Sequence, residues 1–206
     1  MIVLSASYEI LTSEADIQSA VERIAAAART CYKSEKNANA EADARLVKSL
    51  IDRKHDAMLE FADLHVKFTI SRGIANELVR HRMCSFAQES TRYCNYAADK
   101  FGKTIRVIKP SGMNAASEKM WTLHMRAAER TYFDLISLGC KPEIARSVLP
   151  TCLKTELHVK ANIREWRHIL KLRTSKAAHP AMREIMIPLL HELQEITPLF
   201  DDIIAE

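Results

Sequence analysis

Two stretches of the chain alternate strictly between apolar and polar residues. Residues 64–71 place Leu, Val, Phe and Ile at every second position, and residues 157–161 place Leu, Val and Ala in the same way. Successive side chains of a strand point to opposite faces of its sheet, so this period is typical of a strand with one buried face. The two stretches therefore predict half-buried strands, of which the first is the clearest in the chain.

Helical spacing of apolar residues dominates the rest of the sequence. Near the N-terminus Ile17, Val21 and Ile24 follow this spacing, and Ser13 stands three residues before Asp16 as a capping pair. The pattern predicts helices at about 14–31, 41–54, 74–79, 121–135, 163–172 and 180–196, and further strands at about 1–10 and 105–107. The sequence therefore predicts a mixed α/β (α+β) fold, with a mostly antiparallel central sheet surrounded by helices.

The composition of the chain, with few glycines and prolines, limits how it can be organised into domains. Its 206 residues, 48% of them hydrophobic, include only four glycines and six prolines, so we expect residues 1–206 to form a single domain without long linkers. Five cysteines without a CxxC pair argue against a disulfide framework and against a thiolate metal site. The sequence has no signal-peptide pattern and no apolar run long enough to span a bilayer, so we expect a soluble, cytoplasmic protein.

One short segment, from Arg80 to Arg92, concentrates cations and hydroxyl groups. If Arg80, His81 and Arg82 end the short helix, their side chains diverge by about 100° each and contact different neighbours. If the following residues are extended, Gln88, Ser90 and Arg92 fall on one face and form a cradle for a phosphate or a nucleobase edge. The alternative is a solvated, salt-bridged helix end, which fits poorly with the apolar residues at 83, 84 and 86.

This segment resembles the signature of the flavin-dependent thymidylate synthases, the ThyX family. The shared pattern is Arg80-His81-Arg82, then Ser90 after seven intervening residues, then Arg92 and a tyrosine; the segments AARTCY and ARSVLP and the run ending at Arg173 also match in order and spacing. The resemblance implies a homotetramer whose FAD and nucleotide sites are shared between subunits. It also implies transfer of a methylene group from 5,10-methylenetetrahydrofolate to dUMP, with reduction by FADH2 that NADPH regenerates.

The resemblance also implies two sets of binding residues and no metal. The nucleotide set comprises Glu77, Arg80, Gln88, Glu89, Ser90, Thr91, Arg92, Arg146 and Arg173. The FAD set comprises Cys31, His55, Arg80, His81, Arg82, Gln88, Asn162, Arg164, His168 and His179. Two members have open alternatives: Glu77 is equally an i, i+4 helical partner of His81, and Cys31 fits core packing better than FAD contact.

Arg173 is the one residue for which a catalytic role is predicted. In the reaction that the resemblance implies, C5 of uracil must become electron-rich, and a guanidinium beside N3 and its neighbouring carbonyl oxygen stabilises the developing negative charge. Without the resemblance, Arg173 is a cation at a helix C-terminus, favoured by the helix dipole. No cysteine or serine has an evident activating partner, so a covalent nucleophile is not expected.

Two other functions remain open at this point. A related flavin-dependent enzyme that methylates or hydroxymethylates C5 of UMP or another pyrimidine nucleotide would carry the same residues. The more distant alternative is a non-enzymatic nucleic-acid-binding module, but a net charge of only +4 and an aromatic content of 6% argue against it. We therefore expect small-molecule substrates and no nucleic-acid partner.

Overall fold

The chain is organised as two compact units, each assembled from three separate segments. The computed structural model describes residues 1–206, apart from the side chains of residues 32 and 37. Unit 1 contains residues 1–7, 68–80 and 87–157, and unit 2 contains residues 8–67, 81–86 and 158–206. Four strands contribute residues to both units: β2 (Ser7–Ile10), β3 (Asp63–Ser71), β4 (Ser85–Gln88) and β6 (Lys154–Asn162).

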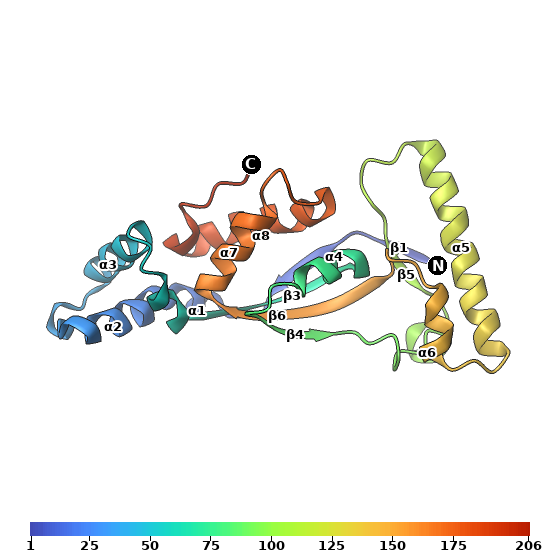
Figure 1. Cartoon of the computed structure of the whole chain (residues 1–206), viewed down its shortest axis with the longest axis horizontal. Coiled ribbons are helices and arrows are strands. Elements are labelled where there is room, and N and C mark those ends of the chain that lie inside the picture. Colours follow the sequence, from blue (N-terminus) through green and yellow to red (C-terminus); the bar gives the residue numbers. More distant parts are fainter. The chain divides into compact units, whose positions relative to one another are not determined.

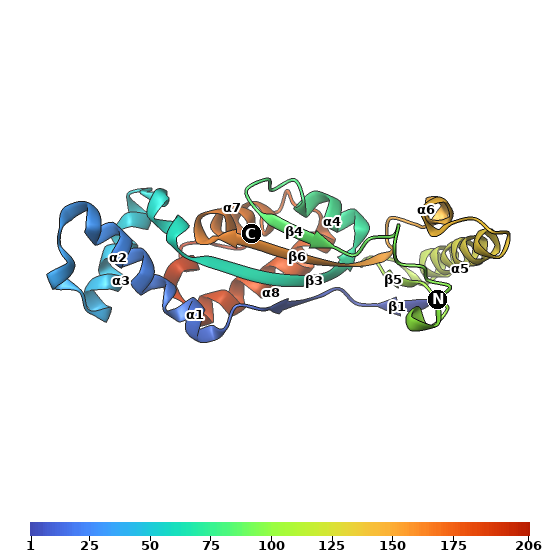
Figure 2. The ribbon, with the colours of Figure 1, turned by 90° about the horizontal axis from the view of Figure 1, so that it is seen from below.

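The main sheet has four strands, in the order β2 (Ser7–Ile10), β3, β6 and β4 (Ser85–Gln88), as Figure 2 shows. The two central strands, β3 and β6, are antiparallel. Residues later in β3 contact residues earlier in β6. Asp63 forms an ion pair with Lys160, His65 contacts His158, and the residue after β3 donates its N–H to the carbonyl of residue 153. The predicted mixed α/β fold with an antiparallel sheet is thus confirmed.

A second, two-stranded sheet lies in unit 1 and was not predicted. The strands β1 (Ile2–Leu4) and β5 (Arg106–Ile108) pair in parallel, with Val3 opposite Val107. About a hundred residues separate the two strands along the chain. Local periodicity contains no information about such a pairing.

The predicted alternation in β3 and β6 is confirmed by burial. In β3, Leu64, Val66 and Phe68 are fully buried, while the residues between them keep part of their surface exposed. β6 follows the same pattern. One face of this strand pair therefore forms part of the core, and the opposite face is polar and partly exposed.

Unit 2 contains helices from both ends of the chain. They are α1 (Glu14–Gln18), α2 (Ala20–Tyr32), α3 (Ala40–Asp52), α7 (Ile163–Arg173) and α8 (Pro180–Ile196), of which α7 and α8 are in contact (Figure 1). Short 3-10 turns occur at Glu35–Asn37, Asp56–Phe61 and Pro198–Phe200. The fully buried Trp166 of α7 donates its indole N–H to the carbonyl of Leu64 over 2.8 Å, and this bond fixes α7 to β3.

The first predicted helix is interrupted. Ser19 separates α1 from α2, and its hydroxyl donates to the carbonyl of Asp16 over 3.1 Å. A serine hydroxyl that bonds a carbonyl one turn earlier competes with regular helical hydrogen bonding. The predicted helix at 14–31 is therefore two helices.

Unit 1 contains α4 (Arg72–Leu78), α5 (Ala115–Ser137) and α6 (Pro142–Ala145), with 3-10 turns at Asp99–Phe101 and Arg146–Val148. Its apolar cluster includes Tyr132 of α5, Ile105 and Leu153. Gly139 follows α5 with a φ of 88°, a left-handed conformation that favours glycine and ends the helix. In the described part of the chain, no helix is long and apolar enough to cross a membrane.

Candidate active site

The segment after α4 departs from the predicted helix end. α4 stops at Leu78, and Arg80 bonds the carbonyl of Glu77 in a turn, so Arg80, His81 and Arg82 are not helical. His81 is buried, with 6% of its surface exposed, whereas Arg80 and Arg82 are exposed. The predicted helical geometry of the three residues is therefore wrong, although His81 does differ in burial from the two arginines. The i, i+4 alternative for Glu77 is wrong, because His81 lies beyond the helix.

The predicted extended row of Gln88, Ser90 and Arg92 is also wrong. β4 ends at Gln88, and a turn follows in which Ser90 accepts hydrogen bonds from the main-chain N–H groups of later residues. The Ser90 hydroxyl accepts the N–H of Arg92 over 3.3 Å. Serine favours such turns because its side chain replaces a main-chain partner. The period-2 interpretation therefore fails after residue 88.

The structure places most of the predicted nucleotide residues in unit 1, where several have polar partners. Arg146 donates to the hydroxyl of the buried Thr91 over 3.0 Å. Gln88 donates its side-chain amide to Thr155 over 3.3 Å, and the guanidinium of Arg92 lies over the ring of the adjacent Tyr93. Arg146 and Thr91, 55 residues apart in sequence, are thus brought together.

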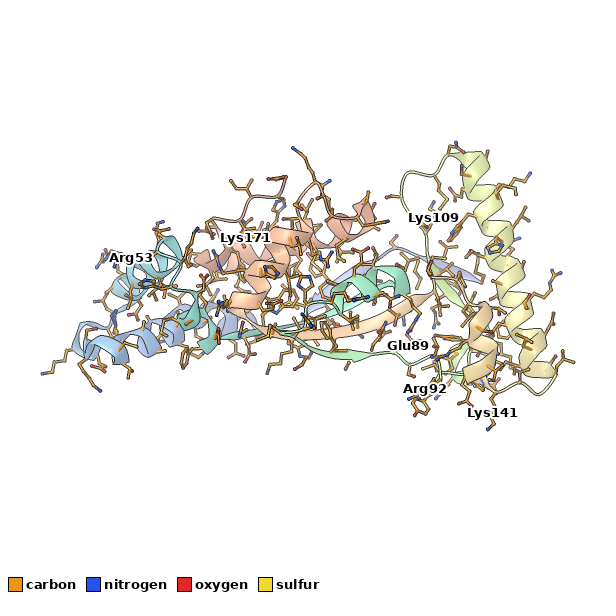
Figure 3. The ribbon with its side chains drawn as sticks, viewed as in Figure 1. Arg53, Glu89, Arg92, Lys109, Lys141 and Lys171 are labelled. Atoms are coloured by element: carbon orange, nitrogen blue, oxygen red, sulfur yellow. The ribbon has the colours of Figure 1, made fainter. Side chains whose placement is uncertain are left out.

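Glu89, which was predicted to bind the nucleotide, forms contacts with other protein side chains. Its carboxylate accepts the hydroxyl of Tyr96 over 2.9 Å and the ammonium of Lys154 over 3.0 Å (Figure 3 labels Glu89). Burial lowers the pKa of Lys154, but the hydrogen bonds that its ammonium donates to Glu156 and Glu89 outweigh this effect and raise that pKa. Glu89 lines a polar cavity of about 320 Å³ in unit 1, with Tyr96, Lys100, Phe101, Arg106, Lys154 and Glu156.

The remaining predicted residues lie in unit 2, where His81 contacts both ends of α7. Arg173 donates its Nε–H to His81 Nε2 over 3.0 Å, and Glu165 Oε1 lies 3.3 Å from His81 Nδ1. Burial lowers the pKa of His81, and the nearby Arg173 lowers it further, against a smaller opposing effect of Glu165. Because arginine has only donors, His81 Nε2 accepts from Arg173, and the lowered pKa favours the same neutral imidazole, whose Nδ1 faces Glu165.

Glu165 was missed by sequence reasoning. It stands three residues after Asn162, whose side-chain oxygen caps α7, so its position fits an ordinary capping pair. Its contact with His81 joins residues 84 positions apart, which no local pattern contains. His81, Glu165 and His168 also offer three metal-ligand atoms within 4.8 Å of one another, but the guanidinium bonded to His81 disfavours a second cation there.

Two cavities in unit 2 are lined by five of the ten predicted FAD residues. The first, of about 560 Å³, is lined by Asn162, Arg164 and His168 together with Asp56, Leu59, Glu60, Met83, Glu165, Arg167 and Lys171. The second, of about 430 Å³, is lined by Cys31, His55 and Arg164, with residues of α2, α3 and the turn at 56–58. Arg164 and Asp56 line both cavities. Cys31 is exposed, so the core-packing alternative for it is wrong.

His179 has a structural contact. It precedes α8 and accepts the main-chain N–H of Ala181 at its Nδ1 atom over 3.1 Å. It is not among the residues that line the two cavities.

The cysteine nearest this site is poorly suited to nucleophilic chemistry. Burial, with a further contribution from Glu165, raises the pKa of the Cys84 thiol to about 12. A thiol with such a pKa is almost entirely protonated near neutral pH, so its thiolate is scarce.

Comparison with known proteins identifies the family to which the chain belongs. Residues 14–199 match the family described as "Thymidylate synthase complementing protein". A flavin-dependent thymidylate synthase of Mycobacterium sp. (strain KMS) is 30% identical over 209 residues, which cover 90% of this chain and 80% of the relative. The flavin-dependent thymidylate synthase of Mycobacterium tuberculosis (strain ATCC 25618 / H37Rv) is 32% identical over 192 residues, which cover 84% and 74%.

Two solved structures share the fold. The UMP/dUMP methylase PolB from Streptomyces cacaoi, bound with 5-Br dUMP, superposes with a TM-score of 0.81 at 20% identity, over the full length of both chains. Thymidylate Synthase X (ThyX) from Helicobacter pylori, with FAD and dUMP, superposes with a TM-score of 0.76 at 21% identity, over 98% of this chain and 100% of the other. At these identities the likeness establishes the fold alone. With the sequence matches, it follows that the chain belongs to the flavin-dependent thymidylate synthase (ThyX) family, as the sequence predicted.

Proposed function

We propose that the chain is a flavin-dependent thymidylate synthase, which methylates dUMP to dTMP with 5,10-methylenetetrahydrofolate as carbon donor. The observation that carries this proposal is that five of the ten predicted flavin residues line two cavities, both of which include Arg164, in a chain that belongs to the ThyX family. These residues come from positions as distant as 31 and 168. A structural role for each one separately does not account for that gathering.

The lining of the cavities in unit 2 fits FAD. Arg164 and Lys171, whose exposed side chains pair with Glu60 and Asp202, supply cations for a diphosphate, and Asn162 and His168 supply polar groups for hydrogen bonding. Met83, a largely exposed residue, supplies apolar surface for a ring. When bound, the flavin, reduced by NADPH, supplies the hydride that completes the methyl group.

We assign nucleotide binding to the remaining predicted residues. Arg146, Arg92 and the Ser90 turn provide cations and donors for the phosphate of dUMP. Arg173 supplies positive charge to the pyrimidine, which stabilises negative charge as C5 attacks the methylene carbon. The protonated state of Cys84 supports a reaction without a thiolate nucleophile.

Assembly and location are also proposals. We propose that residues 1–206 act as one functional domain in a cytoplasmic homotetramer whose sites combine residues of several subunits. Met83 and Tyr93, which flank the predicted site, are 74% and 75% exposed. Large apolar and aromatic side chains at such exposure are typical of surfaces that another subunit or a ligand covers.

A second candidate substrate is UMP, since the neighbour PolB is described as a UMP/dUMP methylase. A single 2′-hydroxyl distinguishes the two nucleotides.

The test uses the purified full-length protein. We expect it to carry the yellow absorbance of a flavin, which NADPH bleaches under anaerobic conditions. Tritium release from 5-tritiated dUMP should then depend on 5,10-methylenetetrahydrofolate, and the same assay with 5-tritiated UMP decides between the substrates. A colourless protein that cannot be reconstituted with FAD, or one that releases no tritium from either nucleotide, would refute the proposal.

A further inference from the structure

The imidazole of His81 joins two charged side chains of α7 that stand eight residues apart. Glu165 lies in the first turn of the helix and Arg173 in the last. Eight residues of α-helix span about 12 Å, so the two side chains reach the same imidazole from opposite ends of α7. The side chains of His81 and Glu165 are only 5% and 14% exposed, so water competes little for these contacts.

The donors and acceptors of this chain of contacts fix one tautomer of His81. An arginine side chain has only donors, so His81 Nε2 must present its lone pair to Arg173. The proton of the neutral ring is then on Nδ1, where the Glu165 carboxylate accepts it. With the proton on Nε2 instead, two N–H groups would face each other across 3.0 Å.

We propose that Glu165 is a positioning residue, which acts through His81 to hold the Arg173 guanidinium in the orientation that the reaction requires. The proposal rests on the function proposed above, in which Arg173 contacts the pyrimidine. Glu165 stabilises the tautomer with the proton on Nδ1, and the bare Nε2 atom of that tautomer accepts the Nε–H of Arg173 and fixes its direction. A carboxylate that orients a histidine through its other ring nitrogen is a general means of fixing a functional tautomer.

Helix capping does not explain the Glu165 side chain. The N-terminus of α7 is capped by Asn162 Oδ1, which accepts the main-chain N–H of Glu165 over 2.9 Å. That bond uses the backbone of Glu165 and survives replacement of its side chain. A substitution at position 165 therefore removes the contact with His81 and leaves the cap in place.

The first experiment measures the tautomer directly by NMR of the ring nitrogens in ¹⁵N-histidine-labelled full-length protein, with the His81 signals assigned by comparison with His81→Gln. In the parent protein we expect Nδ1 to be protonated and Nε2 to be the bare, hydrogen-bonded nitrogen. In Glu165→Leu we expect the proton to move to Nε2, at least in part, and the Arg173 Nε–H to exchange faster with water. In Glu165→Gln the amide oxygen still accepts from Nδ1, so the parent tautomer should persist.

Activity provides the second readout. We expect kcat for dTMP formation to fall about 10- to 100-fold in Glu165→Leu, because misplacement of a catalytic group by about 1 Å can reduce the rate by that much. In Glu165→Gln we expect kcat to return most of the way to the parent value. The control Glu184→Gln, at an exposed position of α8, should match the parent in both readouts.

The outcomes separate the two proposals. A parent His81 protonated on Nε2, or an unchanged tautomer in Glu165→Leu, would overturn the positioning role whatever the activity. If Glu165→Leu does not fold, the parent tautomer and Glu165→Gln still decide the question. A parent protein with the expected tautomer but no synthase activity would overturn the proposed function and leave the Glu165–His81–Arg173 arrangement intact.

Discussion

Replacement of Arg173 by lysine separates its charge from its geometry. Lysine retains the positive charge but has no planar fork and no Nε–H at the guanidinium position. Loss of a donor that faces developing negative charge reduces kcat by about 10²–10³-fold, which corresponds to about 2.7–4 kcal/mol. We expect Arg173→Lys to lose turnover to that extent, and Arg173→Ala at least as much.

The same substitution has a second effect on stability that can be worked from the contact with His81. The buried Nε2 acceptor, now 3.0 Å from a donor, would be left without it. An unsatisfied buried acceptor costs about 1–3 kcal/mol of the free energy of unfolding. For a chain of this size each kcal/mol lowers Tm by about 2–4 °C, so the expected decrease is roughly 2–12 °C.

Single-turnover formation of dTMP and thermal unfolding measure the two effects. FAD binding should be retained, since Arg173 is not among the residues that line the two flavin cavities. Arg130→Lys, an exposed arginine of α5, serves as control and should change neither quantity. Turnover equal to that of the parent in Arg173→Lys would refute the assignment of a geometric role to this guanidinium.

Three further predictions concern other contacts. Trp166→Phe removes the indole donor to β3 and should lower the free energy of unfolding by about 1–3 kcal/mol in urea titration; an unchanged midpoint would show that the bond does not stabilise the fold. Glu89→Gln weakens the pair with Lys154 and should lower the same quantity by about 1–3 kcal/mol, and equal stability would contradict the role of that pair. Near pH 8, iodoacetamide should alkylate Cys84 on the order of 10³-fold more slowly than the exposed Cys31, because burial raises the pKa of Cys84 to about 12; similar rates in peptide mass spectrometry would contradict the burial.

The elements with strong periodicity were predictable from sequence. The helix at 180–196 has the predicted bounds, and the alternation at 64–70 gives a buried face because hydrophobic spacing reports directly on which side chains leave water. The end of β4 at Gln88 was not predictable from that spacing. There the hydroxyl and carbonyl of Ser90 organise a turn, although the residue pattern also fits an extended strand.

The candidate site was predictable in part. The family pattern identified Asn162, Arg164 and His168, and they line one cavity. It did not identify Glu165, whose partner is 84 residues distant and whose position fits a helix cap. The pattern assigned His179 to the flavin, whereas the structure gives it a contact that caps α8. The spacing of residues in the sequence identifies side chains that suit a given chemistry. Only the tertiary structure shows which of these side chains also contact other parts of the protein.

The interleaving of the two units along the chain has a practical consequence for genetic dissection. A truncation after residue 157 retains every segment of unit 1, yet it leaves residues 8–67 and 81–86 without α7 and α8. No single stop codon or protease cleavage can therefore release either unit alone. Split versions of this protein are expected to regain a complete fold only when both fragments are co-expressed and associate.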